Sequence, residues 1–212
     1  AGQTDQVTQW ETVWNHAYKQ GATAPDPTFN SSGWNDSYTG RPLPAEQMRE
    51  WVAHTVQRIL ACQPKRLLEI GCGTGMLLFR VAPHCTFYCG VDIAQEALHH
   101  IAQHLGSLGE KVTLRQSAAD NFAGFAPADF DTVVINSVTQ LFPSIDYLVD
   151  VLQKALHVVQ PGGSIFVGDV RSLALLEAFH ATVHLHQAPA TLAVAQLQQR
   201  IQRSIYNDEE LF

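Results

Sequence analysis

The sequence predicts an α/β fold with a doubly wound, mostly parallel sheet, and two observations support this prediction. From residue 63 onward, short apolar stretches typical of buried strands alternate with amphipathic helical patterns across short turns. The first apolar stretch, 66–70, runs directly into a glycine-rich turn at 71–75. A turn of this kind follows the first strand of parallel sheets that bind nucleotide-like ligands. Right-handed crossovers then place successive strands side by side.

The first 62 residues are predicted to form a helical lid with a long covering loop. Residues 4–20 form a helix because apolar side chains recur at helical spacing, at Val7, Trp10, Val13, Trp14 and Tyr18. A loop rich in Gly, Pro, Asn and Ser follows at 21–42, and loops of about twenty residues in compact domains are usually functional or disordered. A second helix begins at Pro44, a favourable first helical residue. We therefore divide the chain into this lid, 1–62, and a core with a C-terminal helix, 63–212.

The core elements follow one another in a regular order. Strands are expected at 66–70, 86–91, 111–116, 130–136 and 164–169. Helices are expected near 75–82, 94–105, 145–159, 172–186 and 191–205. A turn at Pro161, Gly162 and Gly163 is expected to separate the fifth strand from the helix before it, because proline stops the helix and glycine reverses the chain.

Composition argues against several classes of partner. Thirteen Lys and Arg against twenty Asp and Glu give a formal net charge of −7, and this negative field disfavours nucleic acid. No stretch of about 18 consecutive apolar residues occurs, and the N-terminus has no secretion-signal pattern. We therefore expect neither nucleic acid nor a membrane as partner, and a cytoplasmic location. The four cysteines and ten histidines lack metal-ligand spacing, so free thiols and no metal site are expected.

The turn after the first strand carries an acid followed by three alternating glycines, from Glu69 to Gly75. Glycine accepts positive φ and lets the backbone approach a ligand closely. A dinucleotide fingerprint needs a glycine where Met76 stands, which weakens the rival interpretation as a nicotinamide-dependent oxidoreductase. Glu69 at the strand end disfavours an anion and favours a ligand with a cationic end. The alternative is a tight turn that binds nothing.

Further acids follow other strands. Asp92 ends the second strand, where a carboxylate can accept hydrogen bonds from both hydroxyls of a ribose, although it could instead be the N-cap of the next helix. Asp169 follows the fifth strand, and Glu177, His180 and His184 share one face of the next helix. An acid and a histidine beside a ligand crevice suit general-base work. Alternatively, Glu177 and His180 are an ordinary pair on a helix surface.

The acid and glycine pattern of 69–75 resembles the first motif of the class I S-adenosylmethionine-dependent methyltransferases. Almost the whole chain resembles a narrower group, the methyltransferase domains embedded in modular polyketide synthases and nonribosomal peptide synthetases. This likeness rests on long strings, which are 26–30 (DPTFN), 33–35 (GWN), 37–40 (SYTG), 44–51 (PAEQMREW), 142–148 (FPSIDYL), 168–173 (GDVRSL) and 176–180 (LEAFH).

The resemblance implies a Rossmann-like sheet and S-adenosylmethionine as cofactor, which leaves as S-adenosylhomocysteine. The residues that it implies as cofactor contacts are Tyr38, Glu69, Gly71, Cys72, Gly73, Gly75, Asp92, Ile93, Ala119, Asp120, Asn136 and Ser137. Asp120 would take the exocyclic amino group of adenine, because 117–122 resembles the adenine-recognition segment of the family. The alternative for that segment is a plain surface turn. The 21–42 loop would close over cofactor and acceptor.

The resemblance also implies a substrate presented on phosphopantetheine by an acyl or peptidyl carrier domain, with neighbouring synthase domains as partners. Residues 136–143 lack the Asn/Asp-Pro-Pro-Tyr pattern of enzymes that methylate nucleic-acid bases. We expect methylation of a hydroxyl, preferably a β-hydroxyl, because the acid and histidine pair Glu177 and His180 is available as a base; Asp169 is the third residue predicted to be catalytic. N-methylation of a carrier-bound aminoacyl group is the alternative, and a non-catalytic docking domain is a further one.

The sequence departs from the family in one respect. Methyltransferases of this class usually close the sheet with an antiparallel hairpin after the fifth strand, whereas residues 172–212 show two helical patterns and no pair of strands. We therefore expect the hairpin to be missing from this chain, and the chain to be a domain excised from a longer polypeptide or cut short. The sheet edge at the fifth strand would then be open or covered by a helix.

Overall fold

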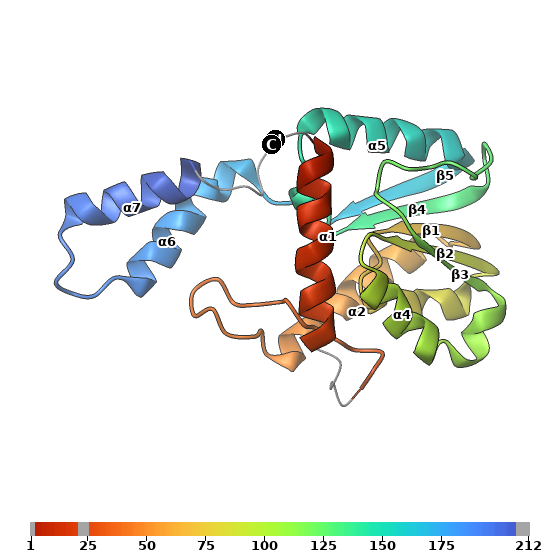
Figure 1. Cartoon of the computed structure of the whole chain (residues 1–212), viewed down its shortest axis with the longest axis horizontal. Helices are drawn as coiled ribbons and strands as arrows, with labels where there is room; N and C mark the ends of the chain where they lie inside the picture. Colours follow the sequence, from red (N-terminus) through yellow and green to blue (C-terminus); the bar gives the residue numbers. More distant parts are fainter. Residues whose placement is uncertain (1–2, 21–25, 207–212) are drawn as a thin grey trace.

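The structure, a computed structural model, describes residues 3–20 and 26–206. Its centre is a sheet of five parallel strands in the order β3-β2-β1-β4-β5, with helices on both faces (Figure 1). The strands are β1 (Arg66–Ile70), β2 (Phe87–Asp92), β3 (Val112–Gln116), β4 (Phe130–Asn136) and β5 (Val159–Gly168). The predicted doubly wound, parallel α/β fold is thus confirmed. The strand order reverses between β1 and β4, and ligands bind at such a switch point, beyond the carboxyl ends of the strands.

The described residues form seven α-helices. They are α1 (Gln3–Gln20), α2 (Ala45–Ala61), α3 (Leu78–Val81), α4 (Gln95–His104), α5 (Ile145–Val158), α6 (Leu176–Gln187) and α7 (Val194–Tyr206). Helix α1 lies across the end of the sheet and packs beside α4 (Figure 1). The element that covers the strand ends therefore comes from the beginning of the chain.

Leu67 and Leu68 show how the sheet divides the core. Successive residues of a strand point to opposite faces, and both of these side chains are completely buried. Leu67 belongs to a cluster with Met48 of α2, whereas Leu68 belongs to a second cluster with Val151 of α5. Burial on both faces explains why the central strands are continuously apolar. It also leaves the strand ends as the place where polar side chains can gather.

Several boundaries differ from those expected, among them the starts of α6 at Leu176 and α7 at Val194, and two of the differences involve turns. The helix expected at 75–82 begins only at Leu78, because residues 71–77 form an extended turn, and it continues as a short 3₁₀ helix, Ala82–His84, at Pro83. Strand β5 begins at Val159 rather than at residue 164, and its pairing with β4 is irregular between Phe130 and Thr132. The expected turn at Pro161 to Gly163 therefore lies inside the strand, where the irregular pairing accommodates it.

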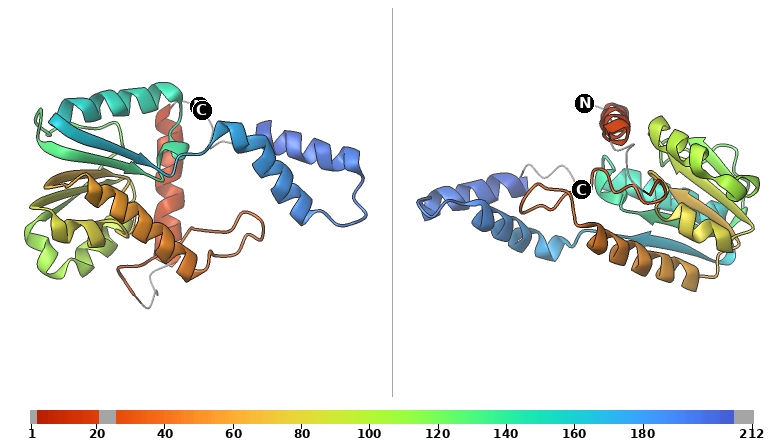
Figure 2. Two further views of the ribbon diagram at one scale, coloured as in Figure 1. Left: turned by 180° about the vertical axis from the view of Figure 1, so that it is seen from behind. Right: turned by 90° about the horizontal axis from the view of Figure 1, so that it is seen from below.

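Helices α6 and α7 form a hairpin that extends away from the sheet in every view (Figures 1 and 2). They pack on each other, and the imidazole Nε2 of His184 lies 2.6 Å from the hydroxyl of Ser204. The 26–42 loop reaches this hairpin, because the Tyr38 hydroxyl lies 3.0 Å from the Thr182 hydroxyl of α6. Residues 21–25 of the predicted lid loop lie outside the described residues.

Several expectations concern what the chain lacks. In residues 3–20 and 26–206, every strand is parallel and the elements after β5 are helical. The absence of a closing hairpin and the division at residue 62 stay predictions. No helix within the described ranges has both the length and the apolar character needed to cross a membrane. The four cysteines are free thiols, and no cluster of metal-binding side chains occurs in the part of the chain that is described.

Candidate active site

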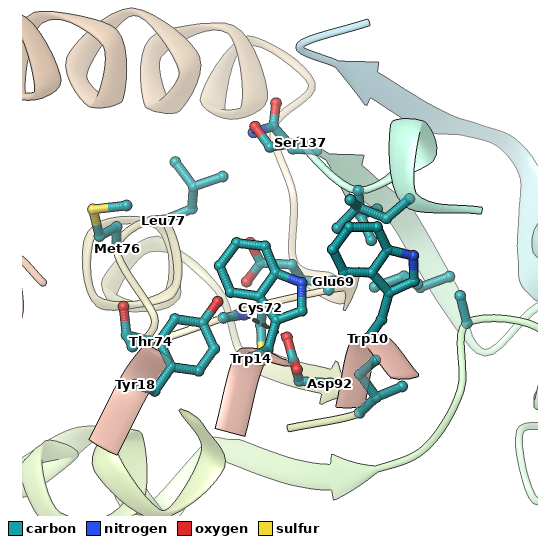
Figure 3. A pocket seen from close by; sticks show the side chains of 18 of the residues that line it. Trp10, Trp14, Tyr18, Glu69, Cys72, Thr74, Met76, Leu77, Asp92 and Ser137 are labelled. Atoms are coloured by element: carbon teal, nitrogen blue, oxygen red, sulfur yellow. Dashed lines mark hydrogen bonds between the residues drawn. The ribbon is translucent and has the colours of Figure 1, made fainter. Parts of the chain in front are cut away.

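A cavity lies beyond the carboxyl ends of β1, β2 and β4, and α1 covers it (Figure 3). Its wall combines the turn after β1, the ends of β2 and β4, and the loops that follow β3 and β4. Aromatic side chains of α1, among them Trp10, Trp14 and Tyr18, point into it from the opposite side (Figure 3). The cavity therefore sits at the switch point of the sheet, where the fold predicts a ligand.

The glycine turn is built for close approach of a ligand. Gly71, Gly73 and Gly75 have φ of 77°, 50° and 85°, in the left-handed region that glycine adopts without strain. A Cβ on Gly71 would lie 3.0 Å from the side chain of Val138, whereas a Cβ on Gly75 would meet Phe79 and Ile101 at 3.0 Å. Gly71 and Gly73 line the cavity, whereas Gly75 faces the core and is not among the lining residues.

Glu69 lies at the end of β1 in the cavity wall and is almost completely buried. The Tyr88 hydroxyl donates a hydrogen bond of 2.6 Å to its Oε2 atom. Burial is the main cause that raises the pKa of Glu69 to about 8, and the nearby Asp92 adds to it. A cation in the cavity would favour the charged form of this carboxyl. Glu69 thus suits the ammonium group of a ligand.

Asp92 lies at the end of β2, next to the glycine turn. Its Oδ2 accepts a hydrogen bond of 2.7 Å from the amide of Gly73, and its Oδ1 accepts one of 2.8 Å from the amide of Ala94. Burial raises the pKa of Asp92, although these two amides act in the opposite direction. The N-cap residue of α4 is Ala94, so the alternative interpretation of Asp92 as the N-cap is wrong. Each oxygen keeps a further lone pair for a ligand hydroxyl.

The segment predicted to recognise adenine follows β3. Ser117 and Ala119 line the cavity, whereas Asp120 does not. The Asp120 carboxylate instead accepts a hydrogen bond of 2.9 Å from the hydroxyl of Tyr147, and its carbonyl oxygen accepts one of 2.9 Å from Lys154. Tyr147 itself lines the cavity. Asp120 is therefore connected to the cavity wall only through its hydrogen bond to Tyr147.

Most of the predicted cofactor contacts come together in this cavity. The ones that line it are Glu69, Gly71, Cys72, Gly73, Asp92, Ile93, Ala119, Asn136 and Ser137. Tyr38 is not among the lining residues, because its loop folds onto α6, where its ring lies edge-on to His186 with 5.5 Å between the ring centroids. The structure therefore does not bring Tyr38 to the cavity.

The three residues predicted to be catalytic lie outside the cavity wall. Asp169 follows β5, is exposed, and accepts a hydrogen bond of 2.5 Å from the Ser137 hydroxyl, which does line the cavity. Glu177 and His180 belong to α6, which extends away from the sheet (Figure 2). Asp169 is thus one hydrogen bond from the cavity, whereas the acid and histidine pair of α6 is not among the lining residues.

The aromatic side chains of α1 that cover the cavity, Trp10, Trp14 and Tyr18, form what we call the aromatic roof, and they were not predicted as site residues from the sequence. Trp34 of the 26–42 loop and Trp51 of α2 also line the cavity, so all four tryptophans of the chain do. Trp14 and Tyr18 stack with 5.4 Å between ring centroids. The helical spacing of aromatic residues in α1 was the available signal. Helix α1 is held on α4 by its polar side, where Asn15 Oδ1 accepts from the Glu96 amide at 3.0 Å and Lys19 pairs with Glu96 at 3.1 Å.

The cavity wall combines acidic side chains with aromatic ones. No Lys, Arg or His is among the described residues that line it. Burial raises the pKa of Tyr18 and of Cys72, with the nearby Asp92 adding to both. Aromatic faces attract cations, and buried carboxyls gain from them. The site therefore fits a ligand that carries positive charge, hydroxyl groups and a planar ring.

Comparisons with known proteins identify the chain. A family model described as a methyltransferase domain matches residues 68–165. Chondramide synthase of Chondromyces crocatus is 46% identical over 211 residues, which are 99% of this chain and 5% of that protein. The nonribosomal peptide synthetase agiA of Aspergillus flavus is 32% identical over 216 residues, which are 99% of this chain and 3% of that protein. The chain thus spans a small part of these curated relatives.

Solved structures share the fold. The N-methyltransferase NodS of Bradyrhizobium japonicum, in complex with S-adenosylhomocysteine, has a TM-score of 0.56 at 17% identity and covers 90% of this chain and 85% of its own. Phosphoethanolamine N-methyltransferase 1 of Haemonchus contortus has a TM-score of 0.60 at 16% identity, with 79% and 33% covered. The chain belongs to the class I S-adenosylmethionine-dependent methyltransferases, uses S-adenosylmethionine as cofactor, and resembles the methyltransferase domains of nonribosomal peptide synthetases.

Proposed function

We propose that this chain transfers a methyl group from S-adenosylmethionine to the amino nitrogen of an aminoacyl group, which a carrier domain presents on its phosphopantetheine arm. The observation that supports an amine over a hydroxyl is the chemistry of the cavity wall. Its described residues combine buried acids with aromatic rings and include no Lys, Arg or His. Since the buried carboxyls Glu69 and Asp92 are assigned to the cofactor, the acceptor must react with little help from a base in the wall.

The cofactor fits the described residues. Glu69 suits its ammonium, Asp92 suits its ribose hydroxyls, and Ala119 and Tyr147 line the part of the cavity where adenine would lie. Bound S-adenosylmethionine supplies a methyl group that its sulfonium already activates. The chain itself must hold the acceptor in line with the methyl group. The aromatic roof of α1 must exclude water from the cavity.

An amine and an alcohol place different demands on the site. An alcohol needs a base that takes its proton as the new bond forms, whereas an α-amino group with an ordinary pKa of about 8 is partly uncharged at neutral pH. Tyr18 and Cys72 stay protonated, because burial raises the pKa of each. They are therefore poor bases. The preference for a β-hydroxyl depended on Glu177 and His180, and neither is a lining residue.

The relatives support the same choice. The chain is similar over nearly its full length to parts of nonribosomal peptide synthetases, and the resemblance to their methyltransferase domains implies an amino acid held on a carrier domain. Because the chain spans 5% or less of the two relatives named above, a carrier domain and neighbouring synthetase domains are partners in this proposal. The 26–42 loop, which contacts both the core and α6, would then lie near the entry of the arm.

A hydroxyl acceptor is the second candidate. It is favoured by the hydrogen bond between Ser137, which lines the cavity, and Asp169, an exposed acid at the end of β5. A hydroxyl placed beside Ser137 could pass its proton toward that carboxylate. This route needs Asp169 as a base and does not involve α6.

The test is a direct comparison of products. Alanyl-pantetheine and 3-hydroxybutyryl-pantetheine would be incubated separately with the protein and S-adenosylmethionine, and the products would be identified by mass spectrometry. The proposal predicts N-methylalanyl-pantetheine and little methylation of the hydroxyacyl compound. A methoxybutyryl product without an N-methyl product would overturn it. Free alanine, which lacks the pantetheine arm, is the control and should be methylated much more slowly than alanyl-pantetheine.

A further inference from the structure

Asn30 places an unpaired amide in the wall of the cavity. The residue lines the cavity and is 2% exposed. Its Nδ2 atom is buried and has no hydrogen-bond partner among the described residues. A buried donor without a partner costs free energy, and such groups are rare in native proteins unless water or a ligand satisfies them. The amide therefore has two hydrogens that no described residue accepts.

The orientation of this amide is fixed by its other end. Asn30 Oδ1 accepts hydrogen bonds from the amide of Ser32 at 3.0 Å and from its hydroxyl at 2.6 Å. Since both groups donate, the oxygen must be on that side and the Nδ2 atom on the other. The carbonyl oxygen of Asn30 accepts from the Thr74 hydroxyl at 3.0 Å, which ties the residue to the glycine turn.

The segment before Asn30 is also held. Phe29 is buried, and the guanidinium groups of Arg49 and Arg80 lie over its ring at 5.0 and 5.4 Å. Arg80 also donates a hydrogen bond of 2.8 Å to the carbonyl oxygen of Thr28. These contacts fix the backbone at Asn30 to α2 and α3 before any ligand arrives. A donor fixed in this way binds without further ordering.

The cofactor has one anionic group, the carboxylate of its methionine end. That group cannot pair with a cationic side chain of the described wall, which holds no Lys, Arg or His, and it is repelled by Glu69 and Asp92. It needs neutral donors on the side of the methionine α-carbon that faces away from those acids. We propose that Asn30 Nδ2 donates a hydrogen bond to the carboxylate of S-adenosylmethionine, so that Asn30 forms part of the subsite for the methionine end.

The test compares two ligands that differ in this carboxylate. Calorimetry would measure the dissociation constants of S-adenosylmethionine and of its decarboxylated analogue for the full chain and for Asn30→Asp. This substitution keeps the Oδ1 acceptor for Ser32 and replaces the donor by a negative oxygen. We expect binding of S-adenosylmethionine to weaken by roughly 10- to 100-fold, the range for a hydrogen bond to a charged group, and binding of the analogue to change by less than about threefold.

Asn35→Asp is the matched control, since Asn35 is exposed in the same loop and does not line the cavity. It should leave both constants unchanged. If Asn30→Asp does not fold by circular dichroism, Asn30→Ala replaces it with the same expected contrast. Equal weakening for both ligands, or no weakening for either, would overturn the assignment. No acceptor is present in the binding experiment, so its failure is distinct from failure of the proposed N-methylation.

Discussion

The Ser137 hydroxyl donates a hydrogen bond of 2.5 Å to the Oδ2 atom of Asp169, and both residues have a left-handed backbone with φ of 57°. They follow β4 and β5, two neighbouring strands, and Ser137 lines the cavity. Left-handed conformations are costly for residues other than glycine and gather at functional sites. The pair fixes the edge of the cavity at which an acceptor would arrive.

A double-mutant cycle on this pair should detect the hydrogen bond. Ser137→Ala and Asp169→Ala each remove one partner, and we expect a coupling of about 1 kcal/mol in the free energy of unfolding, a modest value because Asp169 is exposed. Urea denaturation of the four proteins measures it. Strictly additive effects would mean that the hydrogen bond contributes nothing to stability.

A comparison of Gly73→Ala with Gly106→Ala should separate the effect of backbone strain on stability from the effect of the new side chain on ligand binding. Gly73 and Gly106 both have φ of 50°, but a Cβ on Gly73 would lie 3.3 Å from the Tyr18 hydroxyl, whereas a Cβ on Gly106 would meet nothing within 4 Å. Both substitutions should cost about 1–2 kcal/mol of stability. Only Gly73→Ala should weaken binding of S-adenosylhomocysteine, by about tenfold or more.

Gly106→Ala is the control in this comparison, because it carries the same strain away from the cavity. Calorimetric titration and urea denaturation of both variants provide the two readouts. Equal affinity for S-adenosylhomocysteine in the two variants would show that the glycine turn does not contact the cofactor.

Glu69 should make the stability of the protein depend on pH. Its pKa is about 8 in the folded chain and ordinarily 4.5. Between pH 4.5 and pH 8, Glu69 is therefore protonated in the folded state and ionised in the unfolded state. Its stabilising contribution is therefore fully present below about pH 4.5 and is lost as the pH rises through about 8. We expect a decrease in the free energy of unfolding of roughly 2–5 kcal/mol between pH 5 and pH 8.

Glu69→Gln should flatten this dependence, since glutamine still offers an oxygen to Tyr88 and cannot ionise. Asp92, whose pKa is also raised by burial, would keep a dependence of the same sign. Urea denaturation at three pH values measures both proteins without ligand. A wild-type curve that rises from pH 5 to pH 8 would contradict the assignment of a raised pKa to Glu69.

His180→Ala and Glu177→Ala should leave N-methyl transfer nearly unchanged. Neither side chain lines the cavity, and an amine acceptor needs no base from α6. We expect kcat/KM within about threefold of the wild type, whereas loss of a general base typically costs a factor of about 100 or more. Steady-state kinetics with alanyl-pantetheine measures kcat/KM for the wild type and for each variant. A decrease in kcat/KM of about 100-fold or more would show that Glu177 and His180 take part in catalysis.

The sequence predicted the parts of the structure that local signals determine. The strand-turn pattern from Glu69 to Gly75 placed the cavity at the end of β1, because alternating glycines after a buried strand have few other uses. The same reasoning placed Asp92 correctly in the wall. The exact start of β5 was missed, since a turn at Pro161 to Gly163 and an irregular strand have the same composition.

The sequence could not predict contacts between distant segments. Helical spacing showed that α1 has an apolar face but not which surface it covers, so the roles of Trp10 and Trp14 were missed. Tyr38 contacts Thr182, which is 144 residues away, and no local pattern reports such a partner. Asp120 was assigned to adenine from the resemblance of residues 117–122, and its hydrogen bond to Tyr147, a residue of α5, is not visible in the sequence.

The most direct measurement of the central claim is the ratio of kcat/KM for alanyl-pantetheine to that for lactyl-pantetheine, because these acceptors have nearly the same shape and differ in the amino group and the hydroxyl. If the acidic and aromatic cavity methylates an amine without a base in its wall, the ratio should exceed about 100, the lower end of what general-base catalysis contributes. A ratio below one would contradict the account and identify the chain as an O-methyltransferase.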